Sequence, residues 1–197
     1  RGADLGSLWY VLELMGLRVP GVNAVCLLLM AAALCAIALL VRRAPRRPRT
    51  AQVILLVLIA FAVCTKAYAP QCALWLLPFV VMARPRVFDW AVWNIAELVY
   101  FFAVWGFLDG VLGPGTGADA LYWGATLLRI GVQLWLAAQV CHDVLNPWDD
   151  PVRVGHVDDL TGGVLDHAVD AVPPPVPQAP PVPPTPLPAA GHDGCPR

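Results

Sequence analysis

Two ionisable side chains, Glu97 and Arg129, stand inside long apolar runs of the sequence. A charge within a membrane-spanning segment is costly, so such residues are usually paired or functional. Counted from Phe88 and Cys141 at the helical rise, Glu97 lies about 13 Å and Arg129 about 18 Å along its run. Consecutive runs are usually neighbours, so a contact between Glu97 and Arg129 is predicted. This ion pair would either lock two helices together, which is the commoner role, or take part directly in chemistry.

The stretch from Lys66 to Gln71 places a cation, a phenol and an amide between two apolar segments. A lysine beside an aromatic ring at a membrane surface can hold a lipid phosphate as a point charge. The Gln71 amide can donate to phosphate oxygens. The commoner interpretation of the same residues is an interfacial anchor, formed by Lys66 and Tyr68 at the end of a span.

The composition argues against a soluble enzyme. Of the 197 residues, 58% are hydrophobic and 14% are charged, whereas soluble domains are nearer ~45–50% apolar and ~25% charged. The mean hydropathy is +0.64. These values predict an all-α, polytopic transmembrane helix bundle. Because the arginines cluster beside apolar runs and not along a soluble face, no nucleic-acid partner is expected.

Five apolar runs follow an amphipathic segment at residues 1–20. That segment is expected to be extracytoplasmic, lying either at the lipid headgroups or against other helices. The runs cover residues 21–41, the two halves of 51–83, 88–108 and 120–141. Each half of 51–83 is only about 23 Å long, so the two halves either cross a thinned bilayer or form a re-entrant hairpin. The transmembrane domain, residues 21–141, therefore has about five spans, or three spans and a hairpin.

The positions of the arginines predict the orientation. Lys and Arg gather in the short loops on the cytoplasmic side of a membrane. The arginines that follow the first and third runs are Arg42, Arg43, Arg46, Arg47, Arg49, Arg84 and Arg86. Both of these loops are therefore expected in the cytoplasm, together with residues 142–197. The localisation predicted is the plasma membrane, as a multi-pass protein with a cytoplasmic C-terminal tail.

The tail, residues 142–197, differs in composition from the rest of the chain. It is acidic as far as Asp170, and Asp149-Asp150 is interpreted as solvated charge. Ten of the sixteen residues 173–188 are proline, which predicts disorder with polyproline II character. The tail is a spacer or, less commonly, an arm that binds a protein partner. No pattern in the sequence identifies a metal site or a cofactor, and Cys64 and Cys72 either pair across the Lys66 turn or stay free.

Residues 64–86, CTKAYAPQCALWLLPFVVMARPR, resemble a segment near the C-terminus of bacterial, especially actinobacterial, GT-C-type glycosyltransferases of the polyprenol-dependent mannosyltransferase kind. Those proteins carry a Lys, aromatic, Ser-Pro-Gln-Tyr run followed by an apolar-Trp-apolar-Pro helix. The matching positions here are Lys66, Tyr68, Pro70, Gln71, Trp75 and Pro78, with Ala69 in place of Ser and Cys72 in place of Tyr. Residues 6–16 and 91–105 are also similar to these proteins, whereas the tail is not.

The resemblance implies the C-terminal membrane portion of an enzyme that moves a sugar, mannose among the candidates, from a polyprenyl-phosphate donor to a cell-envelope lipid or glycan. Lys66 and Gln71 would contact the donor phosphate and Tyr68 would line the same site, so the expected partners are the lipid-linked donor and membrane lipids. The family's general base is a carboxylate in the first extracytoplasmic loop. That loop would precede Arg1, so no catalytic residue is assigned. The alternatives are a non-catalytic scaffold for envelope assembly and, on Glu97 and Arg129 alone, a transporter.

Overall fold

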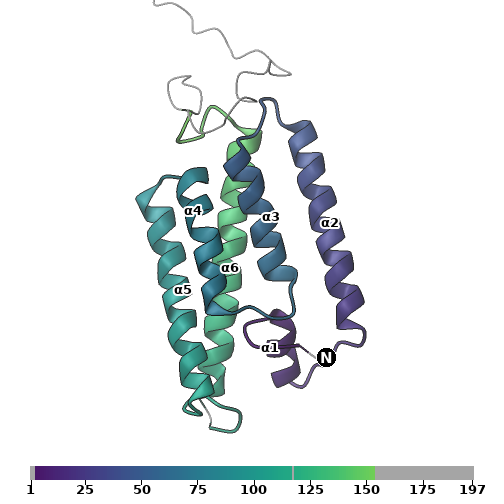
Figure 1. The fold of residues 1–197 in the computed structure, drawn as a ribbon, viewed down its shortest axis with the longest axis vertical. Helices are drawn as coiled ribbons and strands as arrows, with labels where there is room; N and C mark the ends of the chain where they lie inside the picture. Colours follow the sequence, from purple (N-terminus) through teal and green to yellow (C-terminus); the bar gives the residue numbers. More distant parts are fainter. Residues whose placement is uncertain (1–2, 117, 154–197) are drawn as a thin grey trace, which may run out of the picture.

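A computed structural model describes residues 3–116 and 118–153, and in these residues the protein is helical with no strand (Figure 1). This confirms the predicted all-α class for that part of the chain. The proline-rich stretch 173–188 lies outside the described residues. The elements are α1 (Leu8–Leu14), α2 (Val22–Arg43), α3 (Thr50–Cys64), the short 3₁₀ helix η1 (Pro70–Cys72), α4 (Ala73–Ala83), α5 (Val87–Leu108) and α6 (Asp119–Leu145).

Three of the helices, α2, α5 and α6, are long and apolar enough to span a membrane. The other two apolar helices are shorter, with 15 residues in α3 and 11 in α4. At the helical rise they reach about 22 Å and about 17 Å, less than the ~30 Å hydrocarbon core of a bilayer. The structure is therefore a membrane-type bundle of three helices of spanning length and one short helical pair.

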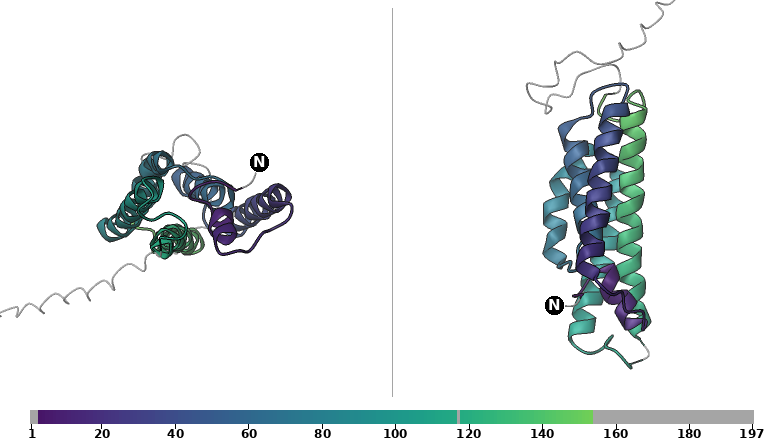
Figure 2. Two further views of the ribbon diagram at one scale, coloured as in Figure 1. Left: turned by 90° about the horizontal axis from the view of Figure 1, so that it is seen from below. Right: turned by 90° about the vertical axis from the view of Figure 1, so that its right-hand side faces the viewer.

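The long helix α6 lies at the centre of the bundle and packs against α5, α3, α2 and α1. Its buried face carries both apolar and polar residues, because it contacts neighbours along most of its length. The first long helix, α2, stands at the edge beside α3 (Figures 1 and 2), and none of its residues is buried. A helix that is apolar along most of its length and has no buried residue suits a lipid environment on most of its surface.

The connections divide between the two ends of the bundle (Figures 1 and 2). One end carries the α2–α3 loop, the α4–α5 loop and residues 146–153, and we call it the arginine end. The opposite end carries α1, the α3–α4 turn at residues 65–69 and the α5–α6 loop, and we call it the loop end. The arginine-rich loops thus share one end of the bundle, as the charge pattern predicted.

The short helix α1 packs beneath the turn that joins α3 to α4 (Figure 1). Its Trp9 and Val11 are only 6% and 1% exposed, and the Trp9 indole donates to the backbone oxygen of Cys64 over 3.3 Å. Of the two alternatives for the N-terminal segment, the structure therefore has the one in which it lies against other helices. Cys64 and Cys72, on either side of the turn, are free thiols in this structure.

Candidate functional site

The connection from α3 to α4, residues 65–72, holds the three residues predicted to bind a phosphate, and two of them line one pocket while the third does not. The Lys66 ammonium donates to the Asn23 amide oxygen near the start of α2, over 2.8 Å. Tyr68 is 1% exposed and points into the bundle. Gln71 is exposed. The structure therefore brings Tyr68 and Gln71 to a common pocket, described next, while Lys66 lies outside its lining.

A pocket of about 310 Å³ opens at the loop end beside the turn, and we call it the loop pocket. Its lining residues come from the N-terminal segment, the turn and α5: Asp4, Leu5, Ala67, Tyr68, Ala69, Pro70, Gln71, Val104, Trp105 and Leu108. The walls are mostly apolar, and the one ionisable group besides Tyr68 is the acid Asp4. An apolar ligand segment suits these walls, whereas an anion would need the cation of Lys66 to turn toward it.

Beneath the pocket lies the second group of predicted residues, around Arg129. This arginine is 1% exposed, and its Nη2 donates to the Gly6 carbonyl oxygen over 2.7 Å. The guanidinium carbon lies 3.7 Å from the centre of the Tyr68 ring and 4.7 Å from that of Tyr100. Two aromatic faces and one backbone carbonyl thus stabilise a buried cation, in the way that cation–π contacts do.

Glu97 belongs to the same group, which we call the Arg129 cluster. The Tyr68 hydroxyl lies 3.3 Å from both Glu97 carboxylate oxygens, and the Gln133 amide donates to one of them over 2.9 Å. No hydrogen bond or ion pair joins Glu97 to Arg129 in the part of the chain that the structure describes. Tyr68 lies between the two charged groups: its hydroxyl faces the Glu97 carboxylate, and its ring faces the Arg129 guanidinium.

Burial raises the pKa of the Tyr68 phenol, and the nearby Glu97 carboxylate acts in the same direction, while Arg129 lowers it. The phenol therefore keeps its proton at neutral pH and remains a donor to Glu97. A neutral donor between a carboxylate and a guanidinium lets both charged groups stay buried without direct contact.

The N-terminal segment is tied to the turn by backbone hydrogen bonds. The Asp4 amide donates to the Lys66 carbonyl over 2.7 Å, and the Tyr68 amide donates to the Leu5 carbonyl over 2.9 Å. The Tyr100 hydroxyl adds a bond to the Tyr68 carbonyl over 2.6 Å. Gly6 follows with a positive φ of 74°, a backbone conformation that glycine adopts without a steric penalty. The turn and the segment before α1 are thus one unit.

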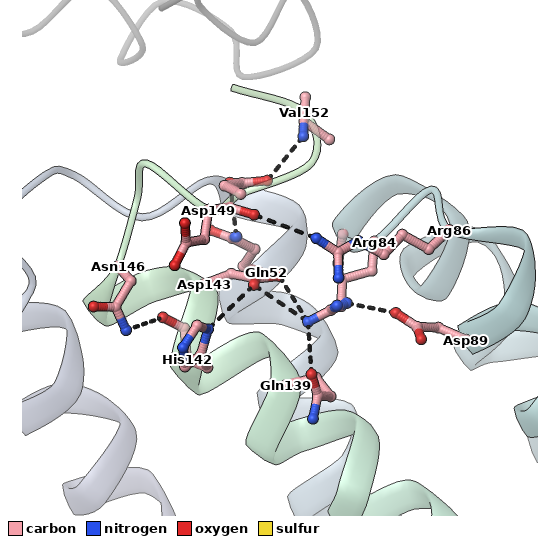
Figure 3. Close-up of polar contacts among 12 residues, drawn as sticks. Gln52, Arg84, Arg86, Asp89, Gln139, His142, Asp143, Asn146, Asp149 and Val152 are labelled. Atoms are coloured by element: carbon pink, nitrogen blue, oxygen red, sulfur yellow. Dashed lines mark hydrogen bonds and ion pairs between the residues drawn. The ribbon is translucent and has the colours of Figure 1, made fainter. Parts of the chain in front are cut away.

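The arginine end has buried charges of its own, and the sequence interpretation missed their partners. Arg49 is fully buried and forms two hydrogen bonds to the Asp150 carboxylate, over 2.9 and 3.0 Å. Arg84 lies between Asp89 and Asp143, at 2.6 and 3.1 Å (Figure 3). The interpretation of Asp149-Asp150 as solvated charge is therefore wrong for Asp150, which is 1% exposed.

Comparisons with known proteins found no relative of this chain. No protein-family model, curated protein or solved structure matches this chain. What the loop end offers chemically is a mostly apolar pocket, a neighbouring lysine on a flexible stem, the Gln71 amide in the pocket wall, and a buried Arg129 cluster that fixes the turn from below.

Proposed function

We propose that this chain is the C-terminal membrane portion of a glycosyltransferase that moves a sugar from a polyprenyl-phosphate donor to a cell-envelope lipid or glycan. One observation carries the proposal. The three stretches that resemble such enzymes, residues 6–16, 64–86 and 91–105, are far apart in the sequence, but parts of them contact one another in the fold. Trp9 contacts the backbone of Cys64, and Tyr68 contacts both Glu97 and Tyr100.

The loop pocket suits the two halves of such a donor. A polyprenyl phosphate joins an apolar isoprenoid chain to an anionic head. Trp105 and Leu108 of α5 line the pocket and are about half exposed, at 51% and 54%, so the pocket borders the surface that lipid would cover. Gln71 lines the same pocket and can donate to phosphate oxygens. Lys66 would supply the charge after leaving Asn23, since a lysine stem is long and rotates freely.

The Arg129 cluster positions the turn in this proposal and takes no part in the chemistry. Its guanidinium is held by Gly6 and by two tyrosine rings, so it has no route to a ligand in the pocket. No catalytic base is assigned to any residue of this chain.

We also propose that the protein spans the membrane several times, with five spans or with three spans and a hairpin, and that the arginine end lies in the cytoplasm. Three full-length helices give an odd number of crossings, and α3 with α4 returns the chain to the arginine end whether or not the pair crosses fully. Epitopes inserted at residues 46–47 and at residues 113–115 test the orientation. On intact cells the second epitope is expected to bind antibody and the first is not, and the reverse pattern would overturn it.

Sugar transfer itself is tested with Lys66→Ala and a matched variant, Asn23→Ala. Both remove the same hydrogen bond, but only the first removes the cation. The assay uses membranes that contain the full-length protein and measures labelled sugar transferred from a polyprenyl-phosphate donor to a lipid or glycan acceptor. Lys66→Ala is expected to lower transfer by roughly tenfold or more, the usual worth of a charge-assisted contact, while Asn23→Ala stays near the unmodified rate.

Two results would overturn the assignment. Unchanged transfer by Lys66→Ala would leave the lysine as an interfacial anchor. Equal losses from Lys66→Ala and Asn23→Ala, at equal amounts of inserted protein, would mean that the bond between them positions the turn and that the lysine does not touch the donor. If the unmodified protein transfers no sugar from any polyprenyl-phosphate donor, the non-catalytic scaffold becomes the better description.

A further inference from the structure

A second pocket, of about 290 Å³, lies at the arginine end between the last turn of α4 and the first turn of α5. We call it the α4–α5 pocket. Its lining residues are Val81, Arg84, Pro85, Arg86, Val87 and Trp90. Val81, Val87 and Trp90 are 45%, 80% and 42% exposed, so apolar side chains form an open wall that no other described segment covers.

The two arginines of this pocket differ in their exposure and in their hydrogen-bond partners. Arg84 is 2% exposed and is bound by Asp89, Asp143 and the Gln139 amide, so its charge is balanced inside the protein. Arg86 is exposed. Its hydrogen bond is a long one, 3.5 Å, to the backbone oxygen of Asp149, and no carboxylate among the described residues pairs with it. The pocket is therefore lined by one exposed arginine, Arg86, which forms no ion pair with any described residue.

The position of the pocket at the start of α5 indicates which part of a lipid layer would contact it. Val87 is the first residue of α5, one of the helices of spanning length, and Trp90 follows within its first turn. The end of a spanning helix is where the hydrocarbon core gives way to the headgroups, and tryptophan and arginine are typical of that layer. Arg86 then lies at the level of the lipid phosphates, and the apolar wall lies at the level where the acyl chains begin.

We propose that the α4–α5 pocket binds one anionic phospholipid, with its phosphate at Arg86 and the start of an acyl chain against Val81, Val87 and Trp90. Charge complementarity selects the headgroup, since a lipid with net negative charge compensates Arg86 and a zwitterionic lipid does so only in part. The volume is near the lower limit of ligand pockets, roughly 300 Å³, so it accepts the head and upper chain of one lipid. This site is independent of the sugar-transfer proposal.

Native mass spectrometry of the purified, delipidated chain tests the site by titration with phosphatidylglycerol or phosphatidylcholine. The matched pair of variants is Arg86→Gln and Arg43→Gln. Both remove one exposed arginine at the arginine end, but Arg43 ends α2 and does not line the pocket. The unmodified protein is expected to bind one phosphatidylglycerol more tightly than phosphatidylcholine. Arg86→Gln should weaken that binding by roughly tenfold, the usual worth of a charge-assisted contact.

Arg43→Gln is expected to stay within about twofold, because Arg43 is exposed and does not line the pocket. Trp90→Ala should weaken phosphatidylglycerol binding by removing the apolar wall, with thermal unfolding confirming that the bundle is intact. Equal weakening by Arg86→Gln and Arg43→Gln would overturn the proposal, since it would indicate a general attraction to the basic surface. Equal binding of the two lipids, or an unchanged Trp90→Ala variant, would overturn it too.

Discussion

Replacing Gly6 by alanine tests whether the N-terminal segment is fixed against the α3–α4 turn. A Cβ at this position would overlap the Tyr100 hydroxyl and the backbone oxygen of Tyr68. The second is main chain and cannot rotate away. The left-handed φ alone costs an alanine about 1–2 kcal/mol. Loss of the buried bond from Tyr100 to Tyr68, and of the bond from Arg129 to the Gly6 carbonyl, adds roughly 1–3 kcal/mol each. Gly6→Ala is therefore expected to lower the free energy of unfolding by about 3–8 kcal/mol.

Gly16→Ala is the matched control, because Gly16 has a φ of +84° but no atom within 4 Å of the added Cβ. It carries the same backbone penalty without the overlap, so a loss of only about 1–2 kcal/mol is expected. Thermal unfolding in detergent measures both variants, and the difference of at least about 2 kcal/mol corresponds to roughly 4 °C or more, at about 2–4 °C per kcal/mol. Hydrogen exchange should also rise at residues 4–6 and 66–68 in Gly6→Ala alone. Equal melting temperatures for the two variants would refute the close approach.

The buried charges give three further predictions. Tyr68→Phe keeps the ring beneath Arg129 but removes the donor to Glu97, so a loss of about 1–3 kcal/mol is expected, and Tyr68→Leu should cost ~0.5–2 kcal/mol more because the cation–π contact also goes; equal losses in denaturant unfolding would contradict the stacking. Folding raises the pKa of the Tyr68 phenol, so the contribution of this group to the stability of the folded protein is full below the usual pKa of about 10 and falls as the pH rises above it. Tyr68→Phe should therefore reduce the fall in melting temperature between about pH 9 and about pH 11. Arg49→Met or Asp150→Asn alone should cost about 3–5 kcal/mol, and the double variant less than their sum; additive losses in the double-mutant cycle would speak against a direct pair.

The long helices were predictable because apolar length alone determines them. The runs 21–41, 88–108 and 120–141 correspond to α2, α5 and α6, with ends that differ by at most four residues. The largest difference is at the end of α6, which continues to Leu145. Asp143 lies in that extra turn and would end an apolar run by its chemistry. In the structure it remains in the helix because Arg84 supplies the opposite charge.

The polar partners were harder to predict, since most of them are distant in sequence. The rise per residue of a helix predicted similar depths for Glu97 and Arg129. It could not predict that Tyr68, from the turn between α3 and α4, lies between them. Gln133 was within reach of the sequence, because it lies one helical turn after Arg129 on the same face. Asp150 is separated from Arg49 by 101 residues, and only the folded chain shows that they meet.

The shortness of α3 and α4 explains why so many polar groups gather beneath their turn. A turn that ends inside the depth of the bundle places backbone N–H and C=O groups among apolar side chains, so other protein groups must satisfy them. The segment before α1 bonds the amide of Tyr68 and the carbonyl of Lys66, and Tyr100 bonds the carbonyl of Tyr68. The same residues then border the loop pocket. A ligand held partly in the bilayer can therefore reach polar groups that long, continuous helices would have placed outside it.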